Sequence, residues 1–251
     1  DLASLTKPLV TGLLAASKIE DRSIALDTTL GSSSSLFEGS SVSGLTVLQL
    51  ATHTSGLPAW IPLYREARSN KQMDIAATIG EQTLHASPQV EYSDLNFISL
   101  AFLIGDDRLD AIFEHSVVDQ LALGRTCFEP LSRGIDRSQI AASEMGNEYE
   151  KQTCIEKGYL PSQEQRADLE GGLNINGDSY ALANARASAN LRTRQIWGEV
   201  HDGNAYFMVG VAGHAGLFST AEEVFKIALQ FLPEHTKLLK PETCELFRRN
   251  F

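Results

Sequence analysis

The stretch SLTKP, residues 4–8, places a serine and a lysine three positions apart, immediately before a proline. Within one helical turn, positions i and i+3 lie on the same face, so the hydroxyl of Ser4 and the amine of Lys7 can meet. Pro8 has no amide hydrogen and clashes with a preceding helical turn, so we expect the helix to begin at or just after Ser4. That start places Ser4 near the positive end of the helix dipole. With only two fixed positions, the pattern alone is weak and favours an ordinary polar first turn over a catalytic pair.

Composition bounds the classes of function. The 251 residues are 43% hydrophobic and 21% charged, which is typical of a globular domain with a sizeable core. Lysine and arginine total 21 against 32 acidic residues, so the net charge of −11 argues against nucleic acid and anionic membranes as partners. No apolar run approaches the roughly 18–20 residues of a membrane span, so we expect no transmembrane segment. The three cysteines are far apart, which argues against a zinc cluster and a disulfide framework.

Helical patterns dominate the chain, and few segments resemble strands. Ser93 or Asp94 can cap a largely buried helix that Gly105 ends, and Gly124 is expected to close the helix before it. The Gly- and Ser-rich residues 31–43 predict an exposed loop. The expected helices cover residues 5–19, 46–52, 74–84, 93–105 and 109–123, and two more begin at Ser219 or Thr220 and at Pro241.

Residues 140–200 differ from the rest of the chain. They are polar, rich in Asn, Glu and Gln, and hold few long apolar runs. We therefore predict an insertion or lid with weak helices there, within one domain that spans residues 1–251.

Four further segments accompany the opening motif. EYSDLNF (91–97) puts Tyr92, Ser93 and Asp94 at the start of the buried helix, and HTSGLP (53–58) forms a turn between the two motifs. VHDGNAY (200–206) and GHAGLFSTAEEV (213–224) follow downstream. In this order, the segments resemble the serine β-lactamases and penicillin-binding proteins, in particular the class C-like, esterase-type branch. The resemblance covers most of the chain and is weakest over about 145–195.

The resemblance implies an α+β, β-lactamase/transpeptidase-like fold and acyl-transfer chemistry. The family's Ser-x-x-Lys motif fits Ser4 and Lys7, and its Tyr-x-Asn motif, or Tyr-Ser-Asp in this branch, fits Tyr92 and Asp94. The implied catalytic residues are therefore Ser4 as nucleophile, Lys7 as base and Tyr92 as a proton relay. The implied partner is a small-molecule or peptide-like acyl substrate, with no cofactor. The family also suggests a bacterial periplasm or cell envelope.

Several of these residues have simpler explanations. Asp94 is expected either to bind substrate or only to cap its helix, and Tyr92 could be a packing aromatic. His214 lies in His-Ala-Gly, which superficially matches the family's third motif, Lys/His-Thr/Ser-Gly. A capped helix follows it instead of a strand pair, so a structural turn is favoured over a substrate-binding role. His53 is expected to be structural. No HExxH or Gly-x-Ser-x-Gly pattern is present, so neither a metal hydrolase nor an α/β-hydrolase is expected.

The chain departs from the family pattern at both ends. The family's third motif and most of its five-stranded sheet lie outside residues 1–251, so we expect the mostly helical part of the fold. The third-motif strand supplies the second oxyanion donor, and losing one donor costs roughly 100- to 1000-fold in rate. Two functions stay open: a serine hydrolase that forms an acyl-enzyme on Ser4 from an ester, amide or β-lactam, or a catalytically incompetent or truncated relative that only binds peptidoglycan-like or acyl ligands.

Overall fold

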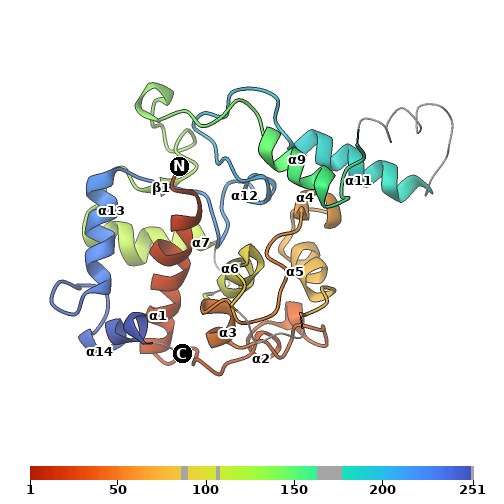
Figure 1. Ribbon diagram of the computed structural model, residues 1–251. Coiled ribbons are helices and arrows are strands. Elements are labelled where there is room, and N and C mark those ends of the chain that lie inside the picture. The colour runs from red at the N-terminus through yellow and green to blue at the C-terminus, as the bar shows by residue number, and fades with distance from the viewer. Residues whose placement is uncertain (86–89, 106–107, 163–176, 250–251) are drawn as a thin grey trace.

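The structure is a computed structural model that describes residues 1–85, 90–105, 108–162 and 177–249. Helices make up about half of it (Figure 1). The α-helices are α1 (Leu13–Glu20), α2 (Leu30–Ser33), α3 (Val47–Ala51), α4 (Leu63–Glu66), α5 (Gln72–Gly80), α6 (Asp94–Ala101), α7 (Leu109–Phe113), α8 (Asp119–Leu121), α9 (Glu148–Glu156), α11 (Gly177–Asn190), α12 (Gly203–Phe207), α13 (Ala221–Ala228) and α14 (Pro241–Cys244).

The described part of the chain contains one two-stranded sheet. β1 (Cys127–Phe128) pairs antiparallel with β2 (Leu217–Phe218), with Cys127 opposite Phe218. The prediction of a mostly helical part of an α+β fold, with little of its antiparallel sheet, is therefore confirmed.

The first helix changes its pitch along its length. A 3-10 turn covers Ala3–Leu5, a π-helical segment covers Lys7–Gly12, and α1 follows without a break. Pro8 provides a physical reason for the wider segment, because it cannot donate the regular hydrogen bond to the carbonyl of Ser4. The helix begins one residue before Ser4, close to the predicted start.

Two apolar clusters enclose this first helix. One gathers around α3, α5 and α6, and includes Phe37, Leu50 and Leu95. The other gathers around α1, the segment that follows α7, and α13, and includes Leu13 and Val117. The π-helical segment contacts both α6 and α13, so it lies between the two clusters. Packing from both sides therefore fixes the position of the Ser4–Lys7 turn.

The predicted exposed loop over residues 31–43 is wrong in part. Thr29 and Ser32 form a capping box that starts α2, and a second short helix covers Ser35–Phe37. Phe37 is completely buried and packs edge-on against Phe102, with ring centroids 5.4 Å apart. Of the serines that predict a loop, Ser32 instead takes part in the capping box of α2.

Two predicted helix ends differ from the structure. Ser93 is the N-cap residue of α6, but its hydroxyl donates to the carbonyl of Pro58 at 2.7 Å. Gly124 does not close its helix: Ala122 adopts the left-handed conformation there, with φ of 50°. The N–H of Gly124 donates instead to Glu223 at 2.8 Å.

The polar residues 140–200 contain α9 and α11. Helix α11 packs on α4 and α12, at the end of the molecule away from α14 (Figure 1). Residues 163–176 lie outside the described residues, so the insertion or lid and the single-domain assignment stay predictions. None of the described helices has the length and hydropathy that crossing a membrane requires.

Candidate active site

Ser4 and Lys7 meet as the sequence predicts. The Nζ of Lys7 lies 2.8 Å from the Oγ of Ser4, and Lys7 is only 2% exposed. The same Nζ forms an ion pair with Asp94 Oδ1 at 2.7 Å and reaches the carbonyl oxygen of His214 at 3.5 Å. A buried amine is thus held in contact with a serine hydroxyl and a carboxylate.

Asp94 reaches Lys7 from the first turn of α6. Its own N–H donates to the carbonyl of Ala59 at 2.9 Å, which ties the start of α6 to the 53–58 turn. Its side chain pairs with Lys7 instead of capping the helix. The carboxylate therefore belongs to the Ser4 site and not only to the helix end.

Tyr92 borders the same site with its ring. Lys7 Nζ lies 4.6 Å from the ring centroid, a cation–π distance, and the side chain is 54% exposed. Within the described ranges, no hydrogen bond involves the Tyr92 hydroxyl. The ring contact places Tyr92 beside Lys7, while its role as a proton relay stays a prediction.

His53 supports Tyr92 from the other side. The two rings lie 4.6 Å apart, and His53 has a left-handed backbone with φ of 58°. Its Nδ1 lies 3.1 Å from both the backbone nitrogen of Ser93 and the side-chain amide nitrogen of Asn96, which donate to it. Nδ1 therefore carries no proton, and the neutral ring bears its proton on Nε2. Burial, and then the charge of Lys7, lower the pKa of His53, in line with this tautomer.

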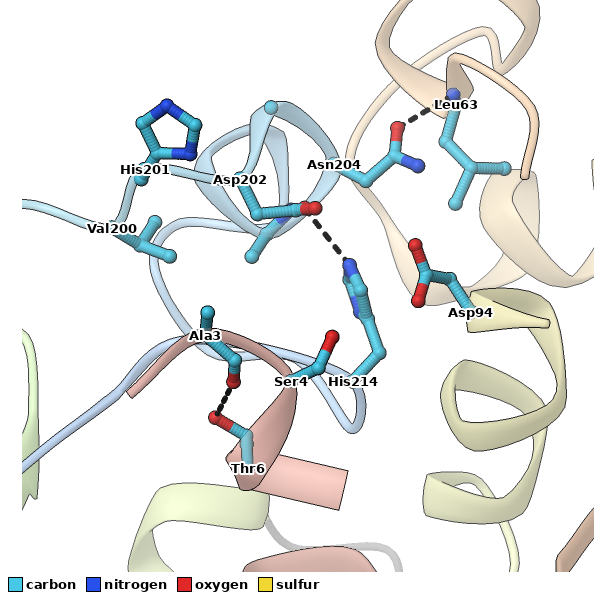
Figure 2. A network of polar contacts seen from close by, with 12 residues as sticks. Ala3, Ser4, Thr6, Leu63, Asp94, Val200, His201, Asp202, Asn204 and His214 are labelled. Carbon is cyan, nitrogen blue, oxygen red and sulfur yellow. Dashed lines mark hydrogen bonds and ion pairs between the residues drawn. The ribbon is translucent and has the colours of Figure 1, made fainter. Parts of the chain in front are cut away.

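The buried His214 pairs with the partly exposed Asp202 (Figure 2). His214 Nε2 is 2.9 Å from Asp202 Oδ1, and His214 is 1% exposed. Asp202 also caps α12 by accepting from the N–H of Ala205 at 2.7 Å. Burial alone would raise the pKa of Asp202, but the charge and hydrogen bond of His214 outweigh it and lower the pKa to about 2. Burial alone would lower the pKa of His214, and the charge of Asp202 raises it instead.

Glu150 of α9 lies next to the His214–Asp202 pair. Its Oε2 accepts from the N–H of Gly203 at 3.1 Å, next to Asp202 in the chain. Burial, and then the negative charge of Asp202, raise the pKa of Glu150 to about 7. The carboxyl group therefore keeps its proton to a higher pH than an ordinary glutamate does.

The segment before β2 is pinned to the first helix by hydrogen bonds. Thr11 Oγ1 donates to the carbonyl of Gly213 at 2.7 Å, and the N–H of Leu217 donates to Thr6 Oγ1 at 3.2 Å. A Cβ on Gly213 would lie 2.2 Å from the carbonyl oxygen of Phe97, so only glycine fits here. The close packing of Gly213 against α6 therefore places His214 beside Lys7.

An open cavity of about 590 Å³ adjoins Ser4 and Lys7. Most of its lining is apolar: Leu2, Leu5, Pro8, His53, Tyr92 and Phe97 surround the serine and the lysine. His214 does not line this cavity, and its ring is enclosed by protein. A ligand carbonyl can therefore reach Ser4 through a mainly apolar surface, while a contact between substrate and His214, the less favoured of its two predicted roles, stays untested.

One group of side chains has the spacing of metal ligands. Single ligand atoms of Asp94, Asp202 and His214 all lie within 4.8 Å of one another. In the structure, these atoms pair instead with Lys7 and with each other. The expectation of no metal stays a prediction. Asp202 was not among the predicted site residues, and its only signal in the sequence was its place in VHDGNAY.

Sequence comparisons with known proteins find relatives of the β-lactamase and carboxypeptidase type. The sequence model of the Beta-lactamase family matches residues 1–250. A putative D-alanyl-D-alanine carboxypeptidase of Salmonella gallinarum is 28% identical over 193 residues, which cover 72% of this chain and 37% of that protein. One of the same description from Escherichia coli K12 is 30% identical over 137 residues, covering 53% of this chain and 24% of that protein. The chain thus spans well under half the length of these relatives.

Solved structures share the fold at low sequence identity. EstCE1, a hydrolase with promiscuous acyltransferase activity, has a TM-score of 0.58 at 18% identity, over 98% of this chain and 62% of that one. A class C β-lactamase has a TM-score of 0.56 at 15% identity, over 97% of this chain and 52% of that one. An octameric penicillin-binding protein homologue from Pyrococcus abyssi scores 0.57 at 15% identity, over 97% and 47%. Since the family model matches nearly the whole chain, this protein belongs to the Beta-lactamase family.

Proposed function

We propose that this chain carries the acylation site of a serine hydrolase, with Ser4 as nucleophile, Lys7 as base and Tyr92 as proton relay. The observation that carries the proposal is the 2.8 Å contact between Ser4 Oγ and the buried Nζ of Lys7. A serine hydroxyl is a weak nucleophile at neutral pH and needs an adjacent base. A lysine supplies that base when its amine is neutral, and burial favours the neutral form.

The proposed reaction is acyl transfer. Ser4 Oγ attacks a carbonyl carbon while its proton passes to Lys7 Nζ, and the proton then reaches the leaving group by way of Tyr92. The N–H of Ser4 is the expected first oxyanion donor. Water attacks the acyl-enzyme and releases the acid. The apolar lining of the cavity beside Ser4 supports an acyl group with little charge, from an ester, amide or β-lactam.

One observation favours a second candidate, a relative that only binds peptidoglycan-like or acyl ligands. Asp94 lies 2.7 Å from Lys7 Nζ, and a carboxylate at this distance favours the ammonium form, which cannot accept a proton. If that form prevails, the cavity binds a ligand without acylation of Ser4.

Intact-protein mass spectrometry separates the two. The folded 251-residue chain is exposed to a fluorophosphonate and, separately, to a penicillin, beside Ser4→Ala and a matched control, Ser17→Ala, farther along the same helix. One adduct that survives in Ser17→Ala and is absent from Ser4→Ala supports the hydrolase. A penicilloyl adduct extends the proposal to β-lactams. If circular dichroism shows the chain to be folded and no adduct forms, the binding role is the better explanation.

A further inference from the structure

Four titratable side chains are packed together behind Ser4. Lys7 pairs with Asp94 at 2.7 Å, and His214 pairs with Asp202 at 2.9 Å. The ligand atoms of Asp94, Asp202 and His214 lie within 4.8 Å of one another, so the two ion pairs form one cluster. Figure 2 shows the imidazole of His214 directed at Asp202, with the carboxylate of Asp94 on its other side.

Within this cluster, Asp94 opposes the proposed role of Lys7. A base must be neutral before it accepts a proton, and a carboxylate in contact with the amine stabilises its charged form. A second cation near Asp94 weakens that effect, because the carboxylate then interacts with two positive groups. The second cation also repels a positive charge on Lys7 directly.

His214 has the properties of that second cation. It is enclosed by protein, its Nε2 contacts Asp202, and Asp94 lies within a few ångströms. The charges of Asp202 and Asp94 raise the pKa of His214, although its burial opposes them. Asp202, with a pKa of about 2, stays ionised at neutral pH and holds the imidazolium in place.

We propose that His214, held by Asp202, is a positioning residue of the Ser4–Lys7 site: its imidazolium offsets the charge of Asp94 and so allows Lys7 to accept the proton of Ser4. The inference rests on the proposed function. In the step concerned, the O–H bond of Ser4 breaks, an N–H bond forms on Lys7, and the serine oxygen bonds to the substrate carbon while the carbonyl π bond opens and leaves its electron pair on the substrate oxygen. His214 itself gains and loses no proton.

The test measures kcat and KM for p-nitrophenyl acetate from pH 5 to pH 10, in EDTA. The variants are His214→Gln, Asp94→Asn, the double variant of the two, and Asp202→Asn. The control is His201→Gln, a neighbouring histidine that pairs with Glu144 at 2.9 Å outside the cluster. The groups that face the His214 ring are Asp202, Asp94 and Lys7.

Glu150 lies close enough to Asp202 for the two carboxyl groups to interact, and its pKa is about 7. Glu150→Gln is therefore measured beside the other variants, so that the titration of Glu150 is not mistaken for that of the cluster.

We expect His214→Gln to lower kcat at pH 7 by about tenfold or more, with KM within about twofold, because a buried charge a few ångströms away is removed. Its activity should recover at higher pH, because the pH at which kcat rises on the acid side of the profile moves to a higher value. Asp94→Asn should move that pH to a lower value. In the Asp94→Asn background, His214→Gln should cost less than about threefold, because coupled residues are not additive.

A loss in His214→Gln that is equal at every pH, and equal in both Asp94 backgrounds, would show a packing role and overturn the proposal. If His214→Gln does not fold, His214→Asn, a smaller neutral amide, must show the same upward shift. Asp202→Asn removes a negative charge that also attracts Lys7, so its profile should shift less than those of the histidine variants. Loss of wild-type activity in EDTA, restored by Zn²⁺, would also overturn the proposal by making the cluster a metal site. Absence of any Ser4 adduct in the wild type would instead refute the proposed function.

Discussion

Replacing Glu150 by glutamine is expected to stabilise the fold much more above pH 7 than at pH 5. The native carboxyl group keeps its proton up to a pKa of about 7, while the ordinary value is 4.5. Between these two values the native state binds more protons than the unfolded chain, so the free energy of unfolding falls as pH rises. Above pH 7 the loss is constant, because both states are ionised.

The size of the effect follows from the pKa. The difference between pKa values of 4.5 and about 7 corresponds to about 3 kcal/mol in the free energy of unfolding, at about 1.36 kcal/mol per unit of pKa. Part of the Glu150 side chain meets solvent, which reduces the expected gain to about 1–3 kcal/mol. Glutamine keeps an oxygen for the N–H of Gly203 and removes the charge beside Asp202.

Urea unfolding at pH 5 and pH 8 measures this gain, with Glu148→Gln as the control. Glu148 lies on the same helix, is 74% exposed and pairs with Lys151, so its replacement should change stability by less than about 0.5 kcal/mol at either pH. A gain of equal size at both pH values would mean that a neutral side chain simply packs better. No gain at pH 8 would mean that Glu150 is not held protonated by its surroundings, and either result refutes the reasoning.

Three further predictions concern packing and hydrogen bonds. Glu223→Gln should destabilise the fold by about 1–3 kcal/mol at pH 7 and much less at pH 3 in urea titrations. Burial opposes the lowered pKa of Glu223, but bonds from Thr126, Gly124 and Arg125 prevail, so its stabilisation is lost as pH falls through the native pKa; exposed Glu222→Gln is the control. Gly213→Ala should abolish labelling of Ser4 and destabilise the fold by at least about 2 kcal/mol, because its Cβ would lie 2.2 Å from a backbone oxygen, whereas Gly44→Ala meets nothing within 4 Å. Phe37→Ala should cost about 3–5 kcal/mol in the same assay, and a value near zero would mean that residues 31–43 behave as the exposed loop that the sequence predicts.

Local rules of sequence predicted much of the helical framework. The expected helix over 46–52 is observed as Val47–Ala51, and Thr220 caps α13 by accepting from the N–H of Glu223. These predictions rest on capping chemistry and helical spacing, which act within a few residues. The meeting of Ser4 and Lys7 follows from the same spacing.

The parts that depend on distant segments could not be predicted in the same way. Asp202 precedes a helix of five residues, too short to show a periodic pattern, and its contact with His214 crosses a turn. Phe37 lies in a segment whose glycines and serines predict exposure, and its burial is decided by α5 and α6. In both cases the deciding partner is outside the window over which sequence patterns act.

Asp94 connects the family resemblance to the charge cluster. The family's second motif also occurs with asparagine at this position, and a neutral amide would hydrogen bond to Lys7 without favouring its charged form. An aspartate there brings a carboxylate into a buried site, and a buried charge needs compensation. Lys7 pairs with Asp94 directly, and in our proposal the imidazolium of His214, held by Asp202, adds to that compensation. We therefore expect relatives with asparagine at this position to tolerate loss of the histidine, whereas those with aspartate should lose activity at neutral pH. The rate of fluorophosphonate labelling in a matched pair of such relatives would check this, and equal losses in both would contradict it.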